Sequence, residues 1–178
     1  AHLSGTGFRL ACYLIGFESF SDEELARYNK GQTAADSEAA IARFDTLAAS
    51  YNNFRLTPSH GFILFGPWTT LGDLKKNIAV FRRIDFSRYR GGLTRSRLRL
   101  NTDAALIARA RADGLVLDER SHGDHGSAAE TGYQMEIPYR FADDAVARAW
   151  ELLNGSRPIR GTDECDRLER AVALAERE

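Results

Sequence analysis

Cysteine is almost absent from this chain of 178 residues. Only Cys12 and Cys165 are present, and their separation fits neither a CxxC pair nor a three-cysteine motif. The chain therefore cannot by itself supply the thiolates that hold a 4Fe–4S cluster. Cys12 lies in an apolar stretch, which indicates a strand residue packed in the interior.

Long hydrophobic runs and a strong net charge are also missing. The longest apolar run, residues 61–65, is far too short to cross a bilayer, and the N-terminus lacks the basic-then-apolar order of a signal peptide. The formal net charge is -1, so no global field draws the chain to nucleic acid or to an anionic membrane. We therefore expect a cytoplasmic protein, one domain or one domain with a tail, without a nucleic-acid or membrane partner.

Positive charge is nevertheless concentrated in one segment. Its arginines are Arg82, Arg83, Arg88, Arg90, Arg95, Arg97 and Arg99. Guanidinium groups match carboxylates and phosphates, so one interpretation is a site for an anion or an acidic partner. The other, more common for such runs, is a solvated face whose charges are balanced by Asp and Glu elsewhere.

Strand and helix patterns alternate along the first two thirds of the chain, which predicts parallel strands joined by right-handed crossovers. Apolar runs and a basic-apolar alternation predict strands over 8–15, 54–65 and 95–100. The first predicted helix runs from a Ser21/Glu24 capping box to about Lys30, and the second starts at Thr33 and has Tyr51 as its last residue at helical spacing. The third runs from a cap at Thr69 or Thr70 through Phe81, and the fourth from about Asp103 to Asp113 before Gly114.

The last third of the chain has a different character. Residues 120–131 are rich in Gly, Ser, His and Asp and predict a loop, 133–139 predict an outlying strand, and two helices are expected, one ending near Gly155 and one over 163–177. The loop holds His122, Asp124 and His125, a donor set that suits zinc or nickel. Because helical spacing is absent and glycines loosen the loop, an unliganded loop is favoured and no metal site is predicted.

Three segments resemble the radical S-adenosylmethionine (SAM) enzymes, in the order expected for that family. Residues 14–25, with Gly16-x-Glu18-Ser19 and then Ser-Asp, and with Lys30-Gly31 after them, resemble the fourth barrel strand and its loop. Residues 61–71 resemble the fifth strand of the cobalamin-binding branch, where Gly66 is more often aspartate. Residues 96–106, with 113–115, resemble the sixth strand and its helix, although the usual Pro-Gly-Thr is here Asn-Thr-Asp.

The resemblance implies an α/β fold: a partial (β/α) barrel with parallel strands over residues 1–118, corresponding to strands four to six, plus a C-terminal helical extension. Residues 119–178 would hold the loop, the outlying strand and the C-terminal helices. The family's N-terminal half, with its Cys-x-x-x-Cys-x-x-Cys loop, has no counterpart here. We therefore expect a fragment of a larger enzyme or a shortened relative that has lost cluster chemistry. Exposed edges of a half barrel predict self-association or a complementary half-barrel.

Glu18 is the leading candidate for a binding residue, because it follows a predicted strand at the end where βα barrels bind ligands. The resemblance implies that Glu18 and Ser19 contact the ribose hydroxyls of SAM and that Lys30 faces its carboxylate. Alternatively, Glu18 caps backbone amides and Lys30 complements a helix dipole. Tyr13, His60 and Trp68 are candidate substrate contacts at the barrel mouth, although such strand residues more often pack in a core. The chain contains no nucleophile elbow, phosphate-binding glycine loop or catalytic-triad pattern.

The function implied by the resemblance is part of a radical SAM enzyme, a cobalamin-dependent methyltransferase of bacterial secondary metabolism. It would act on a small-molecule or peptide substrate and use SAM, cobalamin, and a 4Fe–4S cluster supplied by the missing half. The alternative is a cluster-less half-barrel binding protein that sequesters a small natural product or serves as a partner subunit.

Overall fold

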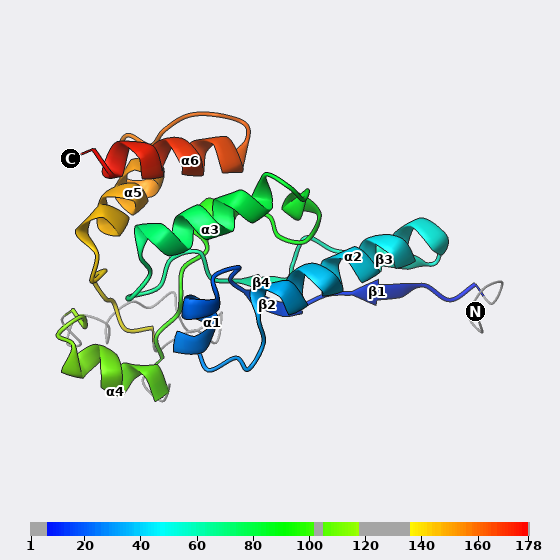
Figure 1. Cartoon of the computed structure of the whole chain (residues 1–178), viewed down its shortest axis with the longest axis horizontal. Helices are drawn as coiled ribbons and strands as arrows, with labels where there is room; N and C mark the ends of the chain where they lie inside the picture. Colours follow the sequence, from blue (N-terminus) through cyan, green and yellow to red (C-terminus); the bar gives the residue numbers. More distant parts are fainter. Residues whose placement is uncertain (1–6, 102–104, 118–135, 178) are drawn as a thin grey trace, which may run out of the picture.

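The computed structural model describes residues 7–101, 105–117 and 136–177 (Figure 1). The strands are β1 (Leu10–Cys12), β2 (Gly16–Glu18), β3 (Phe54–Leu56) and β4 (Gly61–Phe62). The helices are α1 (Asp22–Arg27), α2 (Ala34–Ser50), α3 (Leu71–Phe81), α4 (Ala105–Ala112), α5 (Asp144–Asn154) and α6 (Glu164–Ala175), with the 3-10 turns η1 (Phe86–Arg88) and η2 (Leu93–Arg95). None of the helices in these ranges has the length and apolar character that a membrane span needs.

The second predicted strand is divided into β3 and β4, while the first is shortened to β1 and a separate strand, β2, begins at Gly16, where the prediction ended. β1 pairs with β3 and β2 pairs with β4, both in parallel, with Leu10 opposite Phe54 and Gly16 opposite Gly61. The first run is interrupted at Leu14, whose φ of 55° lies in the left-handed region that extended strands avoid. The prediction of two continuous strands was therefore wrong, whereas their parallel pairing was correct.

The third predicted strand is reduced to a single parallel bridge between Phe65 and Arg97. The Leu98 amide donates to the Phe65 carbonyl at 2.8 Å, so three parallel backbone segments lie in sequence beside one another. Mixed helices and short parallel strands agree with the α/β class, while the partial barrel stays a prediction. The loop with His122 and His125 lies outside the described residues, as does most of the segment at the predicted domain boundary.

One helix start and one helix end follow the sequence pattern, and a second helix start does not. Thr70 begins α3 with a capping box in which Thr70 and Asp73 bond each other's backbone amides, and Gly114 after α4 has a φ of 66°. Ser21 precedes α1 without any side-chain cap bond, and Glu24 is buried. The predicted Ser21/Glu24 box was therefore wrong, because Glu24 turns into the interior.

The core is built largely from aromatic rings between the strands and α3. Phe17, Phe20, Phe62, Phe81 and Phe86 are all buried, and the rings of Phe20 and Phe62 lie 5.3 Å apart between their centroids. α5 and α6 pack on each other and on η2, and α6 also contacts α3 (Figure 1). The helical extension thus closes one side of the core instead of forming a separate body.

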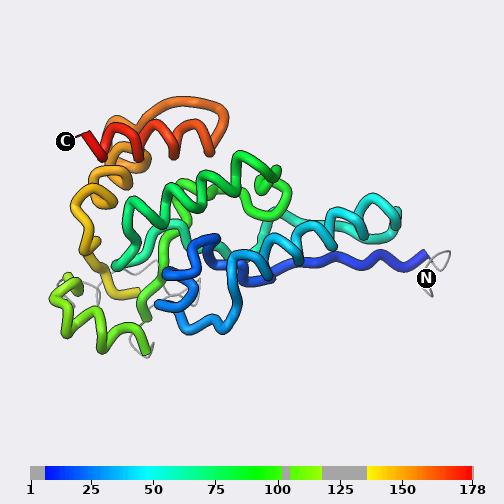
Figure 2. The backbone as a smooth tube through the Cα atoms, viewed as in Figure 1, coloured from blue at the N-terminus to red at the C-terminus, as the bar shows by residue number. Residues whose placement is uncertain are grey.

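β1, β3 and α2 project from this core as an arm that ends near the N-terminus (Figure 2). Phe44 of α2 stacks on Phe54 of β3, with ring centroids 6.4 Å apart. The outer side of the arm remains apolar, since Phe8, Tyr13 and Leu14 are each more than 60% exposed. The arm therefore presents hydrophobic surface that the described residues do not cover.

Candidate ligand pocket

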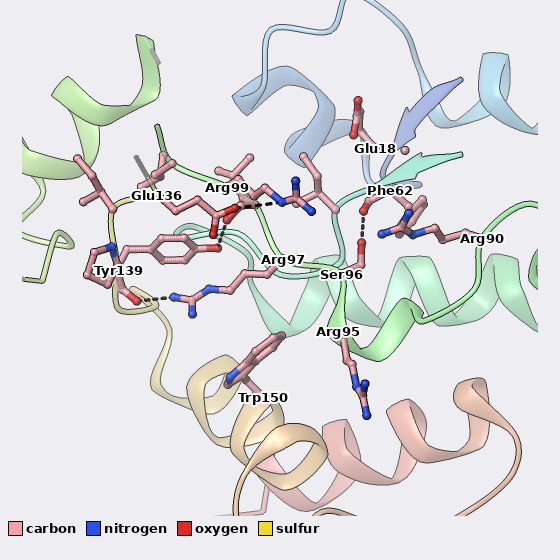
Figure 3. Close-up of a pocket in the computed structure, with 16 residues that line it drawn as sticks. Glu18, Phe62, Arg90, Arg95, Ser96, Arg97, Arg99, Glu136, Tyr139 and Trp150 are labelled. Carbon is pink, nitrogen blue, oxygen red and sulfur yellow. Dashed lines mark hydrogen bonds and ion pairs between the residues drawn. The ribbon is translucent and has the colours of Figure 1, made fainter. Parts of the chain in front are cut away.

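A pocket of about 740 Å³ lies where the ends of β2 and β4 meet the segment after η2 (Figure 3). Its wall consists of residues 61–63, 95–100 and 136–139, with Glu18, Arg90 and Trp150. In βα folds, ligands bind at the carboxyl ends of parallel strands, and the volume falls in the range of small-molecule sites. The pocket is therefore the candidate binding site.

Glu18 reaches this pocket through an irregular stretch of backbone. The pairing register of β2 and β4 shifts between Gly16 and Glu18, and Glu18 has a φ of 63°. A non-glycine residue in the left-handed region costs free energy, and such strained residues and bulges concentrate at functional sites. The irregularity ends β2 at the pocket edge.

The Glu18 carboxylate lies over two glycines and against a lysine. A Cβ atom on Gly16 would be 2.5 Å from Glu18 Oε1, and one on Gly61 would be 3.6 Å from it. Lys30 Nζ lies 2.7 Å from the same oxygen, and the Glu18 side chain is 15% exposed. The absence of a side chain at Gly16 thus makes room for an accessible, charge-paired acceptor, whereas a Cβ at Gly61 would make only an ordinary contact with it.

Of the three predicted cofactor residues, the structure brings Glu18 and Lys30 together and turns Ser19 elsewhere. Ser19 is fully buried, and its Oγ donates to Glu24 Oε2 at 2.7 Å. Asn77 Oδ1 accepts the Phe20 amide at 2.7 Å and fixes the backbone that follows Ser19. Ser19 therefore holds the loop after Glu18 from the interior and does not line the pocket.

The predicted substrate residues lie away from this pocket. Tyr13 is 61% exposed on the arm, and His60 is fully buried with its Nδ1 accepting the Ile15 amide at 3.1 Å. Burial lowers the pKa of His60 and favours the neutral ring. Trp68 donates through Nε1 to Asp113 Oδ2 at 2.7 Å, and Arg109 lies over its ring. None of the three appears in the pocket wall formed by the described residues.

The clustered arginines divide between the two interpretations of the sequence. Arg82, Arg83 and Arg88 are exposed and form ion pairs with acidic side chains, as a solvated face requires. Arg90, Arg95, Arg97 and Arg99 line the pocket together with Tyr139 and Trp150, two residues that the sequence analysis did not single out for a site. The signal available in the sequence was the arginine run itself, but it does not show which of its members face inward.

A buried polar cluster lies directly behind the Glu18 loop. Glu24 Oε1 accepts a hydrogen bond from Thr69 and lies 3.2 Å from the Tyr28 hydroxyl, while Ser19 donates to Oε2. Burial raises the pKa of Glu24 to about 7, although hydrogen bonds from Thr69 and Ser19 act in the opposite direction. The cluster links α1 to the segments that carry the pocket.

The described side chains fit SAM as a cofactor but do not fit a 4Fe–4S cluster. The free thiols Cys12 and Cys165 lie on β1 and α6, and no group of three or more possible metal ligands occurs in the described ranges. These residues do not fit a 4Fe–4S cluster. The Glu18 carboxylate at the pocket edge does fit an acceptor for two ribose hydroxyls of SAM.

Two solved structures are similar to this chain, both of the cobalamin-dependent S-adenosylmethionine radical enzyme OxsB. The apo, selenomethionine-labelled form gives a TM-score of 0.48 with 16% identity and covers 79% of this chain and 23% of that one. The form with aqua-cobalamin bound gives 0.48 with 15% identity and covers 94% and 29%. The relationship is distant, and the chain spans about a quarter of the length of these structures. No family model and no curated protein sequence matches the chain.

Proposed function

We propose that this chain forms one wall of the SAM- and substrate-binding pocket of a radical SAM enzyme. The Glu18 carboxylate accepts hydrogen bonds from the ribose hydroxyls of SAM. Lys30 neutralises and orients this Glu18 carboxylate. In the finer form of the proposal, the enzyme is a cytoplasmic, cobalamin-dependent methyltransferase of bacterial secondary metabolism. SAM supplies the reactive group, and this chain supplies binding and orientation.

The position of the Glu18 carboxylate is the observation that supports this proposal. It lies at the carboxyl end of a parallel strand, over Gly16, on strained backbone and at the edge of the 740 Å³ pocket. A carboxylate held by one ion pair retains lone pairs for two further donors. The two vicinal hydroxyls of a ribose are neighbouring donors that can occupy these lone pairs.

Calorimetric titration of the chain with SAM tests the role of Glu18. We expect Glu18→Gln to weaken binding by about ten- to a hundredfold, the usual range for a hydrogen bond to a charged group. Glu38→Gln is the matched control, because Glu38 pairs with Arg83 outside the pocket wall. Equal affinity of Glu18→Gln and the unchanged chain for SAM would remove the proposal.

A cluster-less binding protein is the second candidate function, favoured by the separation of Cys12 on β1 from Cys165 on α6. Anaerobic reconstitution with iron and sulfide, followed by visible spectroscopy, tests whether the chain holds a cluster by itself. Ligand binding without cluster absorbance is the result that the binding protein requires. Cluster absorbance from the isolated chain would exclude it.

A further inference from the structure

Glu18 needs support from its surroundings because its backbone conformation is unfavourable. The Ser19 amide donates to the Phe17 carbonyl at 2.8 Å, which encloses Glu18 in a three-residue turn. Glu18 has a φ of 63°, and a turn of this kind with a positive φ at its centre is rare and strained. Strained residues persist only where neighbouring contacts hold them in place.

Two hydrogen bonds hold the side of this turn that faces the strands. The Ile63 amide, just after β4, donates to the Glu18 carbonyl at 2.7 Å. Gln32 Nε2 donates to the Phe17 carbonyl at 3.1 Å, before the turn. Neither bond involves the residues that follow Glu18, so the chain that leaves the turn needs an anchor of its own.

Asn77 of α3 anchors the chain that leaves the turn. It is fully buried, and its Oδ1 accepts the Phe20 amide at 2.7 Å. The same oxygen lies 3.3 Å from Ser19 Oγ. Because α3 contributes Leu74 and Ile78 to the core, this bond ties the turn to a fixed part of the fold.

The other end of the Asn77 side chain destabilises the fold. Its Nδ2 is buried and has no hydrogen-bond partner among the described residues. A buried donor without an acceptor costs free energy, and a leucine of similar size would avoid that cost. The gain from asparagine at this position is therefore the bond between Oδ1 and the Phe20 amide.

We propose that Asn77 is a positioning residue that keeps Glu18 in the left-handed conformation and its carboxylate at the edge of the pocket. This inference rests on the proposed function and adds the residue that presents the SAM-binding carboxylate. Asn77 has no exposed surface and does not appear in the pocket wall formed by the described residues, so it acts through Glu18. Because φ sets the direction of the Cα–Cβ bond, relaxation of Glu18 would move its carboxylate from its place over Gly16.

Nuclear magnetic resonance tests the position of Glu18 without any ligand. Three-bond coupling constants across the N–Cα bond report φ, so they distinguish the left-handed from the extended conformation. We expect Asn77→Leu to shift these constants at Glu18 toward extended backbone, because leucine has no acceptor for the Phe20 amide. Asn77→Ala also lacks the acceptor and is measured in the same way, so the test does not depend on leucine fitting the space. Unchanged constants at Glu18 in these variants would overturn the inference.

Calorimetric titration with SAM tests the consequence for binding. We expect Asn77→Leu to weaken SAM binding by about five- to tenfold, because only the molecules with Glu18 in place can bind through it. The double variant Glu18→Gln/Asn77→Leu should bind SAM within about twofold of Glu18→Gln alone, since Asn77 acts through Glu18. Losses that multiply in the double variant would show a general weakening of the fold and would overturn the inference.

Tyr89→Phe is the matched control for the loss of buried hydrogen bonds. Tyr89 is buried outside the described pocket wall, and its hydroxyl lies 2.8 Å from Asp45 Oδ1 and 3.1 Å from the Ile41 carbonyl. The variant should leave the coupling constants at Glu18 unchanged and the SAM affinity within about twofold. The same changes at Glu18 in Tyr89→Phe as in Asn77→Leu would overturn the inference.

The two measurements separate this inference from the proposed function. If the unchanged chain fails to bind SAM while Asn77→Leu still shifts the coupling constants at Glu18, the proposed function alone is contradicted. If the unchanged chain binds SAM through Glu18 and Asn77→Leu binds it equally well, the inference alone is overturned.

Discussion

Position 66 must be glycine because the side chain of Tyr28, far away in the sequence, occupies the space that a Cβ atom would need. A Cβ atom at position 66 would come well inside 3.0 Å of the Tyr28 hydroxyl and within 3.3 Å of its ring carbon Cζ. That hydroxyl lies 3.2 Å from Glu24 Oε1, so it cannot move without disturbing the buried cluster. The aspartate more often found here in the family that the sequence resembles therefore has no room in this chain.

Replacement of Gly66 by alanine should be destabilising because the new methyl group overlaps the Tyr28 hydroxyl. We expect Gly66→Ala to lower the free energy of unfolding by about 1–3 kcal/mol in urea titrations. The same change should cost less in a Tyr28→Phe background, where the hydroxyl is gone. Gly91→Ala is the control, since a Cβ there meets nothing within 4 Å. Equal costs in both backgrounds would contradict the steric account.

At the scale of elements, buried polar contacts hold the short helix α1 against α3. Asp73 at the start of α3 accepts hydrogen bonds from Ser21 and from Arg27. Burial alone would raise the pKa of Asp73, but bonds from Ser21 and Thr70 and the charge of Arg27 outweigh it and lower that pKa. For Glu24, burial outweighs the hydrogen bonds from Thr69 and Ser19 and the charge of Arg27, so its pKa is raised instead.

Glu24 should make the stability of the α1–α3 contact depend on pH. Its pKa rises from 4.5 to about 7 on folding, so the folded state holds the proton more tightly. The protonated Glu24 contributes up to about 3 kcal/mol to the free energy of unfolding. The contribution is fully present below about pH 4.5 and is lost as the pH rises through 7. We expect the unfolding free energy of the unchanged chain minus that of Glu24→Gln to fall over pH 4.5–8 in urea titrations.

Taking the difference between the two chains removes the contribution of His60. Burial lowers the His60 pKa, so its contribution is lost as the pH falls, which is the opposite sign. Glu23→Gln is the matched control, because the pKa of exposed Glu23 is lowered to about 2 by the hydrogen bond from Lys76. Its difference curve should be flat over the same range. A flat curve for Glu24→Gln would show that Glu24 stays ionised in the fold.

At the scale of the whole molecule, the arm carries apolar surface without a partner among the described residues. Phe8, Leu10, Tyr13 and Leu14 are between 53% and 69% exposed, and β1 pairs on one edge only. Parallel sheets are usually covered on both faces, and open strand edges invite further pairing. The arm is therefore the part of the fold expected to associate.

Sedimentation velocity should show association of the isolated chain as its concentration rises. We expect the double variant Leu10→Lys/Leu14→Lys to remain monomeric, because charges on an edge strand oppose pairing. Leu174→Lys, a matched change at a 42% exposed position on α6, should associate like the unchanged chain. A concentration-independent sedimentation coefficient for the unchanged chain would contradict this prediction.

Local patterns were sufficient for the order of elements and for most helix starts. The Thr70 cap, the apolar stripe of α3 and the left-handed Gly114 depend on residues within a few positions of one another, so their spacing predicts them directly. Glu18 at the end of a parallel strand was predicted in the same way, with help from the family resemblance. The ion pair between Lys30 and Glu18 was not predicted, because the resemblance implied only that Lys30 faces the carboxylate of SAM.

Tertiary packing decided which way each polar side chain turns. Ser21 and Glu24 have the spacing of a capping box, yet Glu24 is buried and accepts hydrogen bonds from Thr69 and Ser19 instead. The inward-facing arginines could not be identified from the sequence, because Tyr139 and Trp150, distant in the chain, form the surface on which Arg97 rests.

The sequence by itself determined the alternation of helices and strands and the absence of a cysteine cluster, because both depend on neighbouring residues and on composition. The tertiary structure alone decided the break at Leu14, the burial of Ser19 and His60, and the choice of arginines that face the pocket. These depend on contacts between residues far apart in the chain, which no local pattern records.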